Sequence, residues 1–141
     1  MPFNTKRRVE FRDTDTAGIV HFTTFFGWME EAEHEALRSL GMSVMSRDDQ
    51  EKISWPRVSA SCDFCNPVRF EDIVDINVSI GKMGTKSVTY EFHLTHAGKD
   101  VARGSLTVVC CRVENGKIDS IAIPDHIRQK LQTLTSASSH N

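Results

Sequence analysis

The chain has 141 residues, of which 39% are hydrophobic and 26% are charged, and these proportions are those of an ordinary globular domain with a real core. Seventeen Lys and Arg residues against nineteen Asp and Glu residues give a formal net charge of −2. This balance excludes recruitment of nucleic acid by a global positive field, although local basic patches stay open. No apolar run reaches the roughly 20 residues of a membrane span, and the N-terminus lacks the apolar core of a secretory signal. We therefore expect one cytoplasmic domain over 1–134 and a polar tail over 135–141.

The N-terminal part of the chain combines acidic side chains with a long helical pattern. Residues 6–11 predict a short strand that leads to Asp13 and Asp15, and Gly18 allows a tight turn after them. Apolar residues then recur three or four positions apart, which predicts a helix over 22–40. The residues of this apolar stripe are Phe22, Phe25, Met29, Ala32, Ala36 and Leu40. The hydroxyls that can cap the helix start are those of Thr23 and Thr24, and the left-handed residue expected past its end is Gly41.

This arrangement places a carboxylate, a glycine turn and a helix N-terminus within about ten residues. A helix N-terminus presents unpaired amides and a partial positive charge. An acid or base beside an anion-stabilising cradle is what acyl transfer requires.

The rest of the chain reads as strands and turns. Residues 41–54 are polar and irregular, and the alternating apolar positions that follow predict strands. The predicted strands are 58–64, 74–80, 88–94 and 101–113. The last is apolar on both faces over 106–111 apart from Thr107, as expected for a buried central strand. A short helix follows Pro124. One long helix and an antiparallel meander predict an α+β fold, in which a concave sheet covers the helix.

The segment 15–22 (DTAGIVHF), together with Phe25 and Glu30, resembles the 4-hydroxybenzoyl-CoA thioesterase family. More broadly, the chain is similar to hotdog-fold acyl-CoA thioesterases of the Tol–Pal-associated type. The resemblance covers nearly the whole chain, and its specific part is Asp-x-x-Gly-hydrophobic-Val before a long helix. It implies a hotdog fold, an antiparallel sheet wrapped around one central helix. It also implies a homodimer or homotetramer with the active site at the dimer interface.

The same resemblance assigns roles to particular residues. It implies that Asp15 is the catalytic carboxylate, as nucleophile or general base, and that the backbone amide of Phe22 polarises the thioester carbonyl. Gly18 belongs to this catalytic turn. The family usually has other aromatic residues where this chain has His21 and Phe25. Both are expected to contact substrate in a pocket that differs from those of named members.

The residues themselves leave several alternatives open. Asp15 could instead brace a turn. His21 could act as a base, line the pocket, or pack at the helix entry and bond to the backbone. Ser87 could reach a partner subunit's active site or serve as a turn hydroxyl. The cations considered for the phosphates of coenzyme A (CoA) are Arg69, Lys86, Arg57 and Lys82.

The four cysteines raise the possibility of a metal or redox site. Cys62 and Cys65 form a CxxC, and Cys110 and Cys111 are adjacent. On strands these spacings place each pair on opposite faces, which argues against a shared zinc ion. We expect reduced, buried thiols, with no metal and no cofactor.

The sequence therefore predicts an acyl-CoA thioesterase that hydrolyses a short-chain or aromatic acyl-CoA to the free acid and CoA. Phe25 and Phe26, or the region of Trp55, are expected to line the acyl pocket. Two alternatives stay open: a hydratase or dehydratase of acyl thioesters that uses His21, and a non-catalytic acyl-binding or scaffold protein.

Overall fold

The computed structural model describes residues 1–44 and 52–135. Its elements in chain order are β1 (Phe3–Arg8), the 3-10 turn η1 (Phe11–Asp13), α1 (Phe22–Ser39), β2 (Ile53–Ser54), β3 (Arg57–Phe64), β4 (Ile73–Met83), β5 (Ser87–His96), β6 (Lys99–Val109), β7 (Cys111–Glu114), β8 (Lys117–Ser120) and α2 (Asp125–Gln132). Among these helices, none is both long and apolar enough to cross a membrane.

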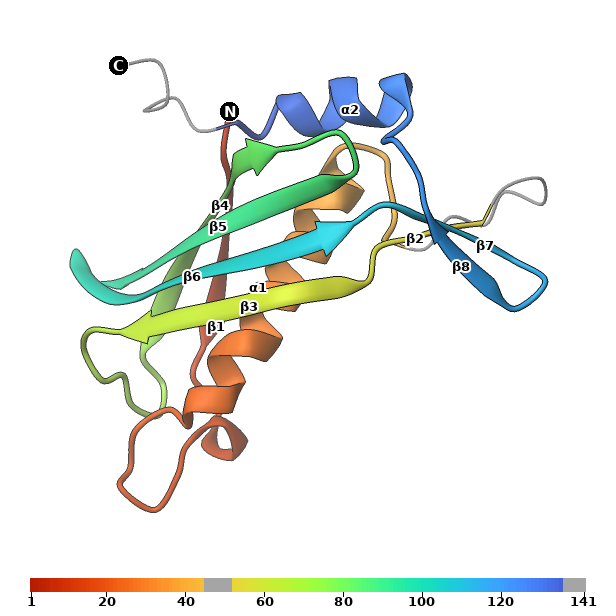
Figure 1. Cartoon of the computed structure of the whole chain (residues 1–141). Coiled ribbons are helices and arrows are strands. Elements are labelled where there is room, and N and C mark those ends of the chain that lie inside the picture. Colours follow the sequence, from red (N-terminus) through yellow and green to blue (C-terminus); the bar gives the residue numbers. More distant parts are fainter. Residues whose placement is uncertain (45–51, 136–141) are drawn as a thin grey trace.

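The strands form two antiparallel sheets. The larger has the order β1-β4-β5-β6-β3, and the smaller has the order β2-β7-β8. β4, β5 and β6 are consecutive neighbours joined by tight turns, and the β5–β6 turn contains Ala97 and Gly98 at positive φ. β1 and β3 are therefore the two edges of the large sheet (Figure 1).

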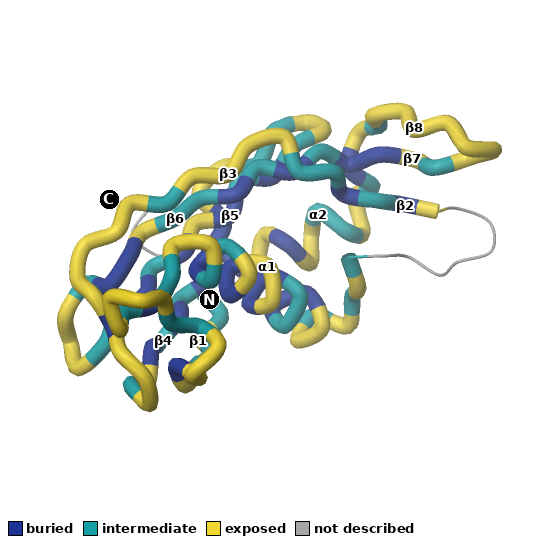
Figure 2. Tube along the Cα trace, turned by 90° about the horizontal axis from the view of Figure 1, so that it is seen from below, coloured by how far each residue is buried: buried dark blue, intermediate teal, exposed yellow. Residues whose placement is uncertain are grey.

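α1 packs against one face of the large sheet, where it contacts β1, β3 and β4. In Figure 2 the strands form an arc over the helix. Within the apolar stripe of α1, Phe25, Met29, Ala32 and Ala36 are buried, whereas Leu40 is half-buried and Phe22 is exposed at the helix start. Gly104 on β6 allows close approach because a Cβ there would lie 2.3 Å from the Met29 sulfur. The helix ends as predicted, with Gly41 at a φ of +76° and the Met42 N–H bonded to the Leu37 carbonyl at 2.9 Å.

These features confirm the α+β class, the long helix and the antiparallel meander. The first strand, however, covers Phe3–Arg8 and ends before the predicted 6–11 segment does. The predicted strand 101–113 is divided at Cys110, after which β7 joins the smaller sheet. Its second face is also less buried than predicted: Thr107 and Val109 are only half-buried, because α1 covers only one face of the sheet.

Two predicted irregular regions lie partly outside the described residues. Within the predicted 41–54 loop, Ile53–Ser54 forms β2, and 45–51 is not described. Of the predicted tail, only Thr135 is described, and it forms a parallel bridge with Ile80.

Candidate active site

The loop before α1 holds Asp15 in a closed turn. One carboxylate oxygen of Asp15 accepts a hydrogen bond from the Ala17 N–H at 2.8 Å, and the Asp15 N–H donates to the Ile19 carbonyl at 2.9 Å. Gly18, at a φ of +81°, donates its N–H to the Asp15 carbonyl at 3.0 Å. Only glycine adopts this left-handed conformation without strain. The second carboxylate oxygen has no hydrogen-bond donor among the described residues and is free for chemistry.

The helix N-terminus beside this turn is capped by His21. Its Nδ1 accepts the Thr23 N–H at 3.2 Å, so the cap predicted for Thr23 and Thr24 is wrong. The Thr24 hydroxyl instead donates to the Asp13 carbonyl at 3.3 Å. The imidazole thus stabilises the first turn of α1 as its N-cap. The Phe22 N–H finds no acceptor within the described part of the chain and stays available to a carbonyl oxygen.

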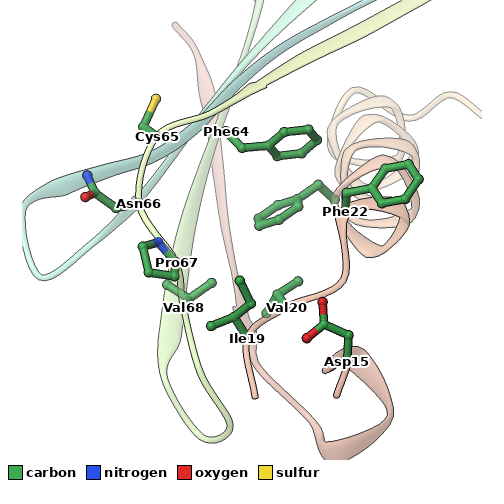
Figure 3. Close-up of a pocket in the computed structure, with 10 residues that line it drawn as sticks. Asp15, Ile19, Val20, Phe22, Phe64, Cys65, Asn66, Pro67 and Val68 are labelled. Atoms are coloured by element: carbon green, nitrogen blue, oxygen red, sulfur yellow. The ribbon is translucent and has the colours of Figure 1, made fainter. Parts of the chain in front are cut away.

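Asp15 and the first turn of α1 border one cavity of about 400 Å³ (Figure 3). Its walls come from the Asp15 loop, α1, the end of β3 and the segment after it. The residues that line it are Asp15, Ile19, Val20, Phe22, Phe25, Phe64, Cys65, Asn66, Pro67 and Val68. The Val20 N–H joins the two loops by a 2.9 Å bond to the Val68 carbonyl. In Figure 3 the Asp15 carboxylate points toward Val20 and Phe22.

The cavity is mostly apolar and aromatic. The Phe64 ring lies 5.4 Å from the Phe25 ring and 6.5 Å from the Phe22 ring, measured between centroids. Phe25 is buried, whereas Phe22 is 56% exposed and Phe64 is 50% exposed. The Phe64 ring is inclined by 48° to the Phe25 ring and by 79° to the Phe22 ring, so the three side chains form an angled apolar wall that an aromatic acyl group can contact edge to face.

The predicted site residues separate into two groups. Asp15, Phe22 and Phe25 line the cavity, and Gly18 and His21 shape its loop and its helix. Arg69 follows the wall residue Val68 but does not line the cavity. Lys86 and Ser87 lie at the start of β5, and the Lys86 ammonium is 3.4 Å from the Ser120 hydroxyl on β8.

Sequence reasoning missed the wall formed by Phe64 and the segment 65–68. Its signal was an apolar residue at a strand end, Phe64, two positions before the Asn66-Pro67 break. The other residues expected to line the pocket, Phe26 and Trp55, pack in or against the core.

The cysteines do not form a metal site within the described ranges, where no cluster of three potential ligands is found. Burial, with a smaller contribution from the nearby Asp63 charge, raises the pKa of Cys62 to about 11. That thiol is therefore protonated and a poor nucleophile at neutral pH. Cys65 is exposed at the cavity wall, so the expectation of buried thiols is wrong for this residue.

A buried ion pair lies further along α1. Glu33 is 1% exposed, and its carboxylate accepts hydrogen bonds from both terminal nitrogens of Arg57 on β3, one of them at 3.3 Å. Glu30 lies 3.5 Å from the same guanidinium. Burial raises the pKa of Glu33 to about 7, although the Arg57 charge opposes the shift. Arg57, which we considered for CoA phosphates, is half-buried and already paired with a carboxylate of this chain.

Comparison with known proteins identifies the family. Residues 9–131 match the thioesterase-like superfamily. The chain belongs to this superfamily. Within it, two curated relatives are 30% identical to the chain, over 132 and 133 residues. The second is a 1,4-dihydroxy-2-naphthoyl-CoA hydrolase from Nostoc punctiforme, and its alignment covers 94% of this chain and 88% of that protein.

Two solved structures are similar throughout. A gentisyl-coenzyme A thioesterase has 35% identity and a TM-score of 0.78, with 89% of this chain and 99% of that chain covered. A 1,4-dihydroxy-2-naphthoyl-CoA thioesterase from Synechocystis has 26% identity and a TM-score of 0.80, with both chains fully covered at 100%. These neighbours confirm the hotdog family and the predicted enzyme class, hydrolysis of an acyl-CoA thioester.

Proposed function

We propose that this protein hydrolyses an aromatic acyl-CoA, with Asp15 as the catalytic carboxylate and the Phe22 amide as the oxyanion donor. One observation carries the proposal: the free oxygen of Asp15 and the first turn of α1 border the same aromatic cavity. The names of the relatives, which specify naphthoyl and gentisyl esters, support an aromatic acyl group over a short aliphatic one.

In this mechanism the thioester carbonyl oxygen accepts the Phe22 N–H, and the positive end of α1 stabilises the charge that develops there. The acyl group lies against Phe22, Phe25 and Phe64. Two routes follow for Asp15. As a base, it takes a proton from the attacking water, the carbon–sulfur bond breaks, and the CoA thiolate leaves and is protonated. As a nucleophile, it forms an acyl–aspartyl anhydride with loss of CoA thiolate, and water then releases the free acid.

The experiment is the Asp15→Asn variant, assayed by thiol release across a panel of aromatic and aliphatic acyl-CoA esters. The carboxamide oxygen can still accept the Ala17 N–H, so we expect the loop and ester binding to be retained. Loss of the base or nucleophile should lower kcat by about 10²–10⁴. Asp119→Asn on β8, an exposed aspartate outside the cavity walls, is the matched control. Normal turnover by Asp15→Asn would reject the assignment.

The two alternative functions have less support. A hydratase or dehydratase needs a histidine in the cavity, whereas His21 caps α1 and does not line the wall. Consumption of an enoyl thioester without thiol release would favour that reaction. Tight binding of acyl-CoA esters with no thiol release from any of them would favour a non-catalytic protein.

The active unit that we propose is a homodimer formed along β3. Among the strands that the structure describes, this edge strand pairs only with β6, and its Val58 is 61% exposed and its Phe64 is 50% exposed. Pairing of two such edges would cover both side chains and bring the cavity to the interface. Arg69, Lys86 and Ser87 would then be candidates to serve the partner's cavity. Light scattering should give twice the 15.9 kDa chain mass, or four times that mass if dimers pair. A single cytoplasmic domain over 1–134 stays our expectation.

A further inference from the structure

A second cavity of about 430 Å³ lies beside the same loop and is polar. It is bounded by β1, η1 and a face of α1 different from the one that carries Phe22 and Phe25. Asp13 lines this cavity and Asp15 lines the aromatic one. Two residues of extended chain span at most about 7 Å, so the two cavities adjoin through this loop.

Four cations line the second cavity: Lys6, Arg7, Arg8 and Arg12. Lys6 pairs with Asp75, and Arg7 pairs with Glu31 and Glu35, each at 3.0 Å. In the described ranges Arg8 and Arg12 have no hydrogen-bonding or ion-pairing side chain as partner. Two arginines thus border a solvent cavity and form no ion pair with a carboxylate of the described residues.

The carboxylates that face the cavity leave this excess in place. Asp13 accepts the Glu10 N–H at 2.8 Å, and Glu31 is held by Arg7. Glu10 is the remaining carboxylate in the wall. Over the whole wall, four cations against the three carboxylates Glu10, Asp13 and Glu31 leave a formal net charge of +1, which favours an anion.

Gly27 leaves open space in the wall of this cavity. It lies inside α1, where glycine is less favourable than alanine. It lines the cavity, and a Cβ at this position would meet nothing within 4 Å. Packing within the chain therefore does not require glycine at this position. A larger side chain at this exposed position would instead project into the space of the cavity.

We propose that this second cavity binds a phosphate group of the CoA moiety through Arg8 and Arg12. The inference rests on the proposed function, because the substrate must be a CoA ester. The aromatic cavity has no cation in its wall, so the phosphates of such a substrate have to lie outside it. A guanidinium donates two parallel hydrogen bonds to a phosphate and retains its charge at all working pH values.

The experiment compares two thioesters of one acyl group: the CoA ester and the S-acyl-N-acetylcysteamine ester, which lacks every phosphate. In Arg8→Gln/Arg12→Gln we expect KM for the CoA ester to rise about tenfold or more, because charge-assisted hydrogen bonds are lost. KM for the truncated ester should stay at the wild-type value. The inhibition constant of free CoA, used as a competitive inhibitor, should rise by the same factor. The matched control is Arg38→Gln, an exposed arginine near the end of α1.

A second variant tests the cavity without removing charge. Gly27→Leu introduces a good helix former and fills the open space, so the helix should not be weakened. We expect a raised KM for the CoA ester only. An unchanged ratio of the two KM values in both variants would overturn the inference. A rise of the KM for the CoA ester in Lys86→Gln or Arg69→Gln, with no rise in the two cavity variants, would overturn it as well. If the wild-type protein hydrolyses neither ester, the proposed function itself fails, which is a separate result.

Discussion

Removal of Arg57 should make the stability of the protein depend strongly on pH, because the buried Glu33 would lose its counter-charge. In the wild-type protein, burial raises the pKa of Glu33 from 4.5 to about 7. A carboxyl whose folded pKa is raised contributes stability that is fully present below its unfolded pKa and is lost as the pH rises through about 7. Above that pH the wild-type contribution is constant.

In Arg57→Gln the pKa of Glu33 should rise further, since the guanidinium that lowers it is gone. Glu30 and His34 on α1 and the buried Tyr90 on β5 are the other groups near this carboxyl. If Glu33 stays protonated up to pH 9, the variant loses about 1.4 kcal/mol for each pH unit above 7. The destabilisation relative to wild type should then grow from about 1 kcal/mol at pH 6, the worth of the lost hydrogen bonds, to about 3–4 kcal/mol at pH 9.

Urea unfolding of both proteins at pH 6 and pH 9 measures this difference. The double variant Glu33→Gln/Arg57→Gln is the control. It has no titrating carboxyl at this site, so it should become more stable relative to Arg57→Gln as the pH rises. Equal destabilisation by Arg57→Gln at the two pH values would refute the reasoning, because it would show that removal of Arg57 does not raise the pKa of Glu33 further.

Two further predictions concern the Asp15 loop and the start of α1. His21→Ala should cost about 1 kcal/mol of stability in urea unfolding, because α1 loses its N-cap, and His21→Asn should restore most of it; an equal loss of kcat in both variants would instead indicate that the imidazole takes part in the chemistry. Gly18→Ala should cost about 1–2 kcal/mol of stability, because alanine is strained at a φ of +81°. No atom lies within 4 Å of the added Cβ, so a steric clash does not add to this cost. Gly18→Asn, which tolerates this conformation better, should cost less in thermal unfolding, and a free-energy change of zero for alanine would show that the turn adjusts.

The local parts of the candidate site could be predicted because their signals lie close together in the sequence. Asp15, Gly18 and the start of α1 fall within one short segment, and backbone bonds inside that segment produce the turn. The helix follows from its apolar period, and its end follows from Gly41. The cap did not follow, because a histidine side chain can accept an amide proton in place of a threonine hydroxyl.

Features that depend on strand order were harder to predict. The alternating pattern of 58–64 predicts a strand correctly, but it cannot distinguish an edge strand from an interior one. The exposure of Val58 and Phe64 on the edge strand β3 was therefore not predicted. Arginine is usually a surface residue, yet Arg57 donates hydrogen bonds to the buried Glu33 on α1, which is distant in the sequence.

The sequence by itself determined the enzyme family, the long helix and the acidic turn at its start, because each is written in residues a few positions apart. Only the tertiary structure decided which distant segment closes the cavity, which arginines remain unpaired and which carboxyl is buried. These outcomes depend on how the sheet brings remote segments together, and alternation along one strand contains no information about its neighbours.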